Sequence, residues 1–497
     1  MLSAETMHRL KLYTTEAVIF DNFEGEFNGS FAGFDVITIE GSTSLELGRR
    51  QNKTGETSLA FKVNSYSANN DAMYTVRDAN NWEFDKDIAI TVDATAVAGD
   101  YVLVDNYKGG YDDFTFTLNG QAYTLGEAVE SSVIKVVDDQ LILSVYDSNT
   151  NLVGNTTEQV VIDSTVAGKE TQIVGDVVDN ATTNSSAAVK ITTDDAVISN
   201  TGTITGAETQ RSVAIEIQSG TSDAVVDNSG TITAADVAKY NRAIYSEGKD
   251  LAVSNSGTIN GEIYQNAYGA KSLDVENSGT ITAMTSDMGS NSVISSSNGI
   301  INLTGDGGTY ELAANTETGK FNGEIVEGQN GIAISASNTT FKAGTDVTVG
   351  NGTVKGLFND SGKNIVISGD NNTIAIVGRN SAIGIEEFSY EGQSDVVISG
   401  DNNTISVTSA SGATGIIGRN GAVVITGSGT EINVTSTGSY AYGIETKDVK
   451  DYSGDVIIGE FNTDGSVAQA SDIQITVDGQ VSTNSNPVMA PIGVYAK

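Results

Sequence analysis

Short segments along most of the chain place Val or Ile at every second position, with small or polar residues between them. One phrase recurs with this alternation: AVISNTGTITG at 196–206, AVVDNSGTITA at 224–234, LAVSNSGTING at 251–261 and LDVENSGTITA at 273–283. A period of two is typical of a half-buried β-strand. Because one such unit cannot bury its apolar side alone, the repeats predict strands that stack on equivalent strands of neighbouring units.

A second repeat family follows the first. VISGDNNTIAIVG at 366–378 returns as VISGDNNTISVTS at 397–409, and VITGSGTEINVTS at 424–436 is a looser copy. Units of roughly 21 to 31 residues fit a three-sided coil with loops of variable length. The sequence therefore predicts an all-β chain with a right-handed parallel β-helix (β-solenoid) over 160–497. About a dozen coils at about 4.8 Å each make a rod on the order of 60 Å long.

The recurring phrase holds one asparagine at a fixed place, at Asn200, Asn228, Asn255 and Asn277. Asn tolerates the left-handed backbone conformation and the Gly two residues later supplies a positive φ, so we expect N-[ST]-G to form a turn. Aligned asparagines of adjacent coils can hydrogen-bond to one another as a ladder. These residues are interpreted as structural, with a ligand site as the minor alternative.

The first 150 residues have a different pattern and form a β-rich N-terminal module. Residues 20–80 suit coils of a preceding solenoid. Residues 82–147 hold the sole tryptophan and several cleanly alternating segments between Gly, Asp and Asn. That pattern predicts a compact antiparallel β module, either a sandwich or a cap, because an open solenoid end exposes strand edges.

Composition supports strands and limits the partners. The chain has 55 Gly but only 2 Pro, which favours many short strands with tight turns over a disordered linker. Its 64 acidic and 26 basic residues give a net charge of −38. A polyanion is repelled by phosphates, so nucleic acid and anionic membrane surfaces are excluded as main partners. No apolar run is long enough for a membrane helix, and we expect no membrane insertion.

The residue inventory leaves little for catalysis. Cysteine is absent and His8, in a terminal tail, is the only histidine. Thiol chemistry, a Ser-His-Asp triad and Cys or His zinc sites therefore have no support. Neither G-x-x-x-x-G-K-[ST] nor G-x-G-x-x-G occurs, so nucleotide binding has none either. We expect no enzyme and assign no catalytic, cofactor-binding or metal residues.

Acidic residues leave two alternatives open. Adjacent pairs occur at 112–113, 138–139, 194–195 and 386–387. Neighbours on a strand point to opposite faces, and the aligned repeats give no acidic cluster over several coils, so glycoside hydrolysis is the minor interpretation. Asp370 and Asp401 in the SGDNNT segments could bind calcium, although turn chemistry explains them without a metal.

Tyrosines gather in one part of the array and offer a candidate binding strip. Four lie within 240–268, at Tyr240, Tyr245, Tyr264 and Tyr268, and Tyr440 and Tyr442 follow later. Exposed aromatic rings would suit a carbohydrate-binding face. Packing within loops is the alternative explanation for the same residues.

The N-[ST]-G-T-I-[TN] phrases at 200–205, 228–233, 255–260 and 277–282 resemble the repeats of passenger domains of bacterial autotransporters, the type V secreted surface proteins, and of related β-helical adhesins. The resemblance covers about 160–497. It implies an extracellular β-helix on the surface of a bacterium with an outer membrane, which serves attachment or aggregation. The signal peptide and membrane β-barrel of that family are not recognisable here, which favours a fragment of a longer protein.

The expected function is thus a segment of a bacterial cell-surface adhesin or stalk. Variable loops, such as 234–242 and 386–395, would make weak multivalent contacts with host or bacterial surface glycans or proteins, and self-association is possible. A carbohydrate-active β-helix, either a polysaccharide lyase or a phage tail-spike depolymerase, is the first alternative. A purely structural spacer is the second.

Overall fold

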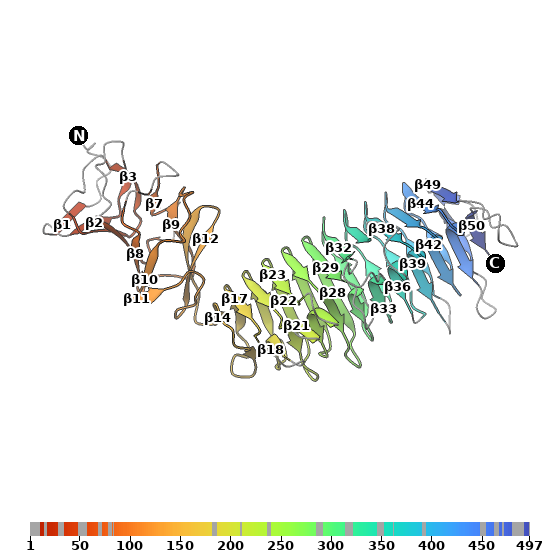
Figure 1. Cartoon of the computed structure of the whole chain (residues 1–497), viewed down its shortest axis with the longest axis horizontal. Helices are drawn as coiled ribbons and strands as arrows, with labels where there is room; N and C mark the ends of the chain where they lie inside the picture. The colour runs from red at the N-terminus through yellow and green to blue at the C-terminus, as the bar shows by residue number, and fades with distance from the viewer. Residues whose placement is uncertain are drawn as a thin grey trace. The chain divides into compact units, whose positions relative to one another are not determined.

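A computed structural model gives the arrangement of the chain (Figure 1). It describes residues 10–13, 17–27, 34–47, 57–67, 72–77, 82, 84–180, 186–208, 211–235, 240–284, 292–313, 322–344, 352–360, 362–389, 394–447, 454–461, 467–469, 472–479 and 492–496. His8 lies outside these residues. The chain divides into two compact units, Met1–Asn155 and Thr156–Lys497.

The N-terminal unit contains two sheets and a final strand, β14 (Thr150–Val153). Sheet N1 contains, in spatial order, β1 (Leu10–Tyr13), β2 (Ala17–Asp21), β4 (Val36–Glu40), β6 (Ser58–Val63), β8 (Asp87–Val92), β10 (Thr115–Leu118) and β11 (Gln121–Tyr123). Sheet N2 contains β12 (Ser132–Val137), β13 (Gln140–Val145), β9 (Gly99–Asp105), β7 (Tyr74–Thr75), β5 (Ser44–Leu47) and β3 (Glu24–Phe27).

Parallel coils continue further through this unit than the sequence predicted. Strands β2, β4, β6, β8 and β10 pair in parallel, and so do β3, β5, β7 and β9. Among the described strands of this unit, antiparallel pairing is confined to β1–β2, β10–β11, β12–β13 and β13–β9. The prediction of an antiparallel module over 82–147 was therefore wrong for β8, which pairs in parallel on both sides, while β9 and β10 each have one parallel and one antiparallel neighbour. Their alternation suits either pairing, because side chains alternate in both kinds of ladder.

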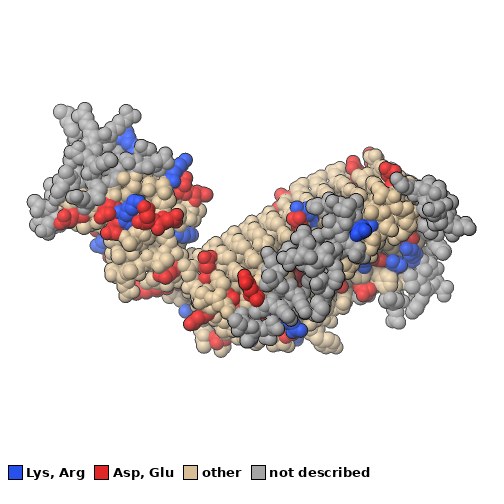
Figure 2. All heavy atoms as spheres, in the orientation of Figure 1, with Lys and Arg blue, Asp and Glu red and all other residues tan. Residues whose placement is uncertain are grey.

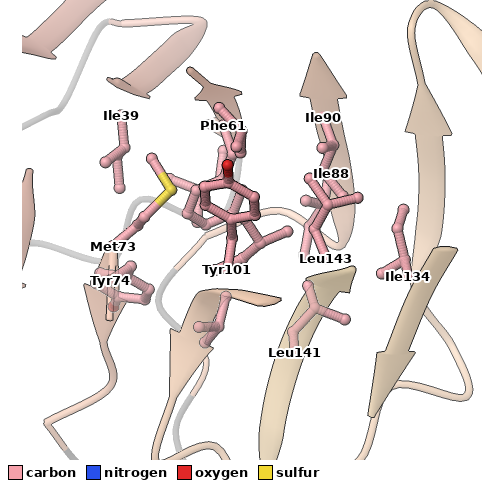
Figure 3. Close-up of a cluster of buried hydrophobic side chains, with 14 of the residues drawn as sticks. Ile39, Phe61, Met73, Tyr74, Ile88, Ile90, Tyr101, Ile134, Leu141 and Leu143 are labelled. Atoms are coloured by element: carbon pink, nitrogen blue, oxygen red, sulfur yellow. The ribbon is translucent and has the colours of Figure 1, made fainter. Parts of the chain in front are cut away.

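The core of the N-terminal unit lies between its two sheets (Figure 3). Ile39, Phe61 and Ile90 from sheet N1 face Tyr101 and Leu143 from sheet N2, and all five are at most 1% exposed. Beside this core the single tryptophan packs among aromatic rings at centroid distances of 5.0 to 6.4 Å, from Tyr74, Phe84, Tyr107, Tyr111 and Phe114. The denser aromatics of 82–147 thus serve packing.

The second unit is a parallel β-solenoid with three sheets. Sheet 1 contains β15 (Val160–Ile162), β18 (Ala187–Ile191), β21 (Arg211–Ile217), β24 (Tyr240–Ser246), β27 (Glu262–Gln265), β30 (Ser292–Ser296), β33 (Gly323–Gly328), β36 (Thr353–Asn359), β39 (Ser381–Phe388), β42 (Gly412–Arg419), β45 (Tyr440–Lys447) and β50 (Ile492–Ala496). Sheet 2 contains β16 (Glu170–Ile173), β19 (Val197–Asn200), β22 (Ala224–Asn228), β25 (Leu251–Asn255), β28 (Ser272–Asn277), β31 (Ile300–Thr304), β34 (Ile332–Ile334), β37 (Ile365–Ile367), β40 (Val396–Ile398), β43 (Val423–Ile425) and β46 (Val456–Ile458). Sheet 3 contains β17 (Asp176–Val178), β20 (Thr203–Thr205), β23 (Thr231–Thr233), β26 (Thr258–Asn260), β29 (Thr280–Met284), β32 (Thr309–Ala313), β35 (Thr340–Ala343), β38 (Thr373–Gly378), β41 (Thr404–Ser409), β44 (Thr430–Ser436) and β49 (Ile473–Gly479). A short antiparallel pair, β47 (Glu460–Phe461) and β48 (Val467–Gln469), lies near the end.

Each coil visits sheet 1, then sheet 2, then sheet 3, and pairs in parallel with the coil before and after it (Figure 1). Rows of apolar side chains fill the interior. In sheet 3 one row runs from Ile204 through Ile232, Ile259 and Ile281 to Tyr310, and all are 0% exposed. The twelve strands of sheet 1 confirm the predicted parallel β-helix and its dozen coils.

The outer surface of the described part carries mostly acidic charge. Among the described residues there is no helix that is long and apolar enough to span a bilayer. Figure 2 shows acidic side chains on the visible face of both units, with fewer Lys and Arg among them. This distribution follows the net charge of −38.

Candidate functional site

The predicted asparagine ladder exists, at the corner between sheets 2 and 3. Asn200 Nδ2 donates to Asn228 Oδ1 at 2.7 Å, Asn228 Nδ2 to Asn255 Oδ1 at 2.7 Å, and Asn255 Nδ2 to Asn277 Oδ1 at 2.8 Å. All four residues are at most 3% exposed. Apart from Asn200 Oδ1, which has no partner, the ladder amides are satisfied by one another and by backbone groups inside the protein, which supports a structural role.

The turn chemistry of the ladder differs from the prediction. The four asparagines end strands of sheet 2 and none has a positive φ, and neither does the Gly that follows each. That Gly is needed for a different reason: a Cβ on Gly230 would lie 2.1 Å from the carbonyl oxygen of Gly202 in the preceding coil. Close approach of neighbouring backbones, and not a left-handed conformation, selects glycine here.

The SGDNNT segments form the left-handed corners instead. Asn371 and Asn402 have φ values of 57° and 55°. Asp370 Oδ1 accepts from the backbone N–H of Asp401 at 2.7 Å, and Asp401 Oδ1 accepts from the N–H of Ser428 at 2.7 Å. These carboxylates bind the backbone of the next coil, which accounts for them without calcium. Within the described residues no group of three or more His, Asp or Glu side chains is placed to hold a metal ion.

The tyrosines divide between exposed and packed positions. Tyr245 and Tyr264 stack in adjacent coils of sheet 1, with ring centroids 5.8 Å apart and an interplanar angle of 28°. Tyr440 and Tyr442 stack on each other in β45 at 5.5 Å. Tyr268 is 95% exposed on a loop. The side chain of Tyr240 lies outside the described part.

Ionisable side chains gather on the outer face of sheet 1, which the sequence analysis did not foresee. The first group surrounds Glu262 of β27. Arg242 Nε donates to Glu262 Oε2 at 3.4 Å and Ser295 Oγ donates to Oε1 at 2.7 Å. The Arg242 guanidinium also lies over the rings of Tyr245 and Tyr264, 4.8 and 4.2 Å from their centroids. This group joins a cation, a carboxylate and two aromatic rings across two coils, and Ser295 adds a hydroxyl from a third.

A second group surrounds Lys355 of β36. Its Nζ lies 3.7 Å from Glu324 Oε1 and 3.1 Å from Glu386 Oε2. Glu386 Oε1 accepts from Arg419 Nε at 2.9 Å and from Nη2 at 2.7 Å. Because both carboxylates touch Lys355, their contacting oxygens lie within about 7 Å of each other. The expectation of no acidic cluster over several coils was therefore wrong.

Burial changes the protonation of this face. Desolvation raises the pKa of Glu262 to about 7, although Arg242 and Ser295 oppose the shift. Desolvation and the nearby charge of Glu327 raise the pKa of Glu324 to about 7, with Lys355 opposing. Burial likewise raises the pKa of Glu387 to about 7, against hydrogen bonds from the Ser394 hydroxyl and the Arg419 backbone N–H. Carboxyls that titrate near neutrality can donate a proton as well as accept one.

Sequence reasoning missed this face because loops of different lengths hide the register of sheet 1. Arg242 aligns with Glu262 after 20 residues, with an irregularity in the ladder beside it, whereas Lys355 aligns with Glu324 after 31. The segments 234–242 and 386–395, predicted as loops, also contain strand residues, since β24 begins at Tyr240 and β39 ends at Phe388. Residues 236–239 and 390–393 lie outside the described part.

The adjacent acidic pairs named from the sequence do not form sites by themselves. Asp138 and Asp139 both have positive φ in the turn between β12 and β13. Asp194 accepts from the backbone N–H of Ser222 in the next coil. Of the four pairs, only 386–387 contributes to the outer face of sheet 1, through Glu386.

No protein-family model, curated protein or solved structure matches this chain.

Proposed function

We propose that this chain is a segment of a bacterial cell-surface adhesin of the passenger type, a non-enzymatic extracellular rod that mediates attachment or aggregation. The observation that carries the proposal is the continuous parallel pairing of the solenoid coils. Sheet 1 pairs in parallel from β15 to β50, apolar rows fill the interior, and the asparagine ladder joins four of the coils. Such a rod presents the same faces repeatedly along its length, which suits weak multivalent contacts with surface glycans or proteins.

Attachment of cells to the immobilised chain tests this proposal. The whole chain is coupled to a surface, and adhesion of bacterial and epithelial cells is counted against a surface coated with albumin. Adhesion several-fold above the albumin surface is expected, as is aggregation of beads that carry the chain. If adhesion of every cell type equals that on the albumin surface and the beads do not aggregate, the proposal is contradicted. The structural spacer would then be the remaining interpretation.

A carbohydrate-active β-helix is the second candidate, and the Glu324–Lys355–Glu386 group favours it. Hydrolysis of a glycosidic bond adds one water: Glu324, with its raised pKa, would give a proton to the leaving oxygen, while Glu386 would take one from the attacking water. Lys355 and Arg419 hold the Glu386 carboxylate between them.

Release of reducing ends from bacterial polysaccharides tests the second candidate. Activity that disappears in both Glu324→Gln and Glu386→Gln, but persists in Glu311→Gln on sheet 3, would support a hydrolase. Cleavage that gives unsaturated ends, detected by ultraviolet absorbance, would instead indicate a lyase. If neither reducing ends nor unsaturated ends are released, the carbohydrate-active candidate is ruled out.

A further inference from the structure

The three outer faces of the solenoid differ in chemistry. Sheet 3 presents a column of half-exposed threonines, which runs from Thr203 through Thr231, Thr258 and Thr280 to Thr309 and on to Thr404. Sheet 1 instead presents aromatic rings, carboxylates and cations in its outward rows. A partner that contacts the side of the rod would therefore meet a column of hydroxyls on sheet 3 and a mixture of aromatic, acidic and basic side chains on sheet 1.

The aromatic rings of sheet 1 occur beside its cations and carboxylates. At the first group, the half-buried rings of Tyr245 and Tyr264 lie next to Arg242 and Glu262. At the second group, Lys355 Nζ lies 3.2 Å from the centroid of the Phe358 ring. Each group thus combines an aromatic surface with groups that donate and accept hydrogen bonds.

Arg419 extends the second group by one coil. Its guanidinium lies 5.0 Å from the centroid of the Phe388 ring, and its side chain remains 24% exposed although it bonds to Glu386. The remaining N–H donors of Arg419 can reach an outside acceptor, because a guanidinium carries five donors and its two bonds to Glu386 occupy only some of them.

Sugars match this combination of groups. The C–H face of a pyranose ring packs on aromatic rings, and its hydroxyls donate to carboxylates and accept from guanidinium and ammonium groups. Charge selects among sugars: the chain has a net charge of −38, so a polyanionic glycan is repelled by the molecule as a whole, while Arg242, Lys355 and Arg419 balance the carboxylates of the face itself. A polymer laid along the rod would meet a new coil about every 4.8 Å.

We propose that the outer face of sheet 1, from β24 to β42, binds a neutral glycan chain laid along the solenoid axis. Stacking on Tyr245 and Tyr264 anchors one end, and hydrogen bonds from Lys355 and Arg419, which Glu386 holds in place, secure the other. This inference rests on the proposed attachment function and gives that function a partner class. Binding distributed over several coils needs no single deep pocket.

Affinity electrophoresis of the whole chain tests the proposal. The gels contain mannan, hydroxyethylcellulose or soluble galactan as neutral probes, and polygalacturonate as the anionic probe. We expect retardation by at least one neutral polysaccharide and none by polygalacturonate. Tyr264→Ala and Arg419→Lys should each raise the dissociation constant about tenfold, because the first removes a stacking ring and the second removes the planar fork.

The matched control is Lys342→Ala, which breaks an ion pair with Glu311 at 2.8 Å on sheet 3. It should leave retardation unchanged, and circular dichroism establishes that all variants are folded. No retardation by any of the three neutral polysaccharides, retardation by polygalacturonate, or equal losses in the control and the sheet 1 variants would each overturn the proposal.

The cell-attachment assay separates this inference from the function on which it rests. If the chain attaches cells and Tyr264→Ala and Arg419→Lys attach them equally well, the face inference fails while the adhesin proposal stands. If the chain attaches no cells but neutral glycan still retards it in the expected pattern, the glycan face stands and the adhesin proposal fails.

Discussion

Asn228 Nδ2 donates to Asn255 Oδ1 at 2.7 Å across two coils of the solenoid, and both side chains are buried. Asn228 also accepts from Asn200, so it has ladder partners on both sides. The net contribution of such a hydrogen bond to the free energy of unfolding is small. Leaving its partner amide buried without a hydrogen bond costs more, because that amide has lost its water and gained nothing in return. The middle of the ladder should therefore matter more to stability than its end.

Asn228→Ala should lower the free energy of unfolding of the solenoid by about 2 to 3 kcal/mol, because it leaves Asn200 Nδ2 and Asn255 Oδ1 without their ladder partners. Urea unfolding followed by circular dichroism measures the change. Asn200→Ala is the matched control, since Asn200 Oδ1 has no hydrogen-bond partner and the ladder ends there. A loss for Asn200→Ala as large as that for Asn228→Ala would contradict a cooperative ladder.

The glycine beside the ladder gives a second prediction. Gly230→Ala should destabilise the solenoid by about 3 kcal/mol, because the new Cβ would meet the Gly202 carbonyl oxygen at 2.1 Å and that backbone is fixed by its own ladder. Gly168→Asn is the control: it has open space around it and a φ of 78°, which Asn tolerates. Thermal unfolding of the two variants should differ by several degrees; equal midpoints would show that the coils can move apart.

The fold was predictable because its determinants are local and periodic. The alternation of Val and Ile with polar residues, repeated at Asn200 and its equivalents, specifies both a strand and its partner in the next coil. The ladder followed from the same alignment. The backbone conformation of those asparagines did not, because N-[ST]-G fits a left-handed turn and a close backbone approach equally well.

The outer face of sheet 1 could not be predicted in the same way. Its members, such as Arg242, Glu262 and Lys355, lie in segments without a shared phrase, and their alignment depends on the length of each intervening loop. Burial of outward-facing carboxylates is likewise a property of the folded chain. Glu386 is 4% exposed although it belongs to an outer row, and no periodic pattern signals this.

The buried glutamates predict an unusual pH dependence. Glu262 has a pKa of about 7 in the folded chain, above the ordinary value of 4.5, so the folded state binds more protons than the unfolded state between these values. The stabilisation from this group is complete below pH 4.5 and is lost as the pH rises through 7. Glu324 and Glu387 act in the same direction.

We expect the urea midpoint of the solenoid to fall between pH 5 and pH 8, and Glu262→Gln to reduce that slope because glutamine does not titrate. Measurements at constant ionic strength separate this effect from general repulsion among the acidic surface groups, which is screened by salt. An unchanged slope in Glu262→Gln, Glu324→Gln and Glu387→Gln alike would show that these carboxyls stay ionised when buried.

The interior row of sheet 3 offers a test of packing. Phe341 is 0% exposed and its ring stacks on Tyr310 at 4.9 Å with an interplanar angle of 3°, in a row made mostly of isoleucines such as Ile374. Phe341→Ala should cost about 3 to 5 kcal/mol, because it opens a cavity between two fixed coils. Phe341→Ile, which matches the neighbouring coils, should cost less than half as much. Lys342→Ala on the outer side of the same strand should change urea unfolding by no more than about 0.5 kcal/mol. If the alanine and isoleucine variants were equally stable, the row would not need to be filled, and close packing between coils could not be what holds this rod together.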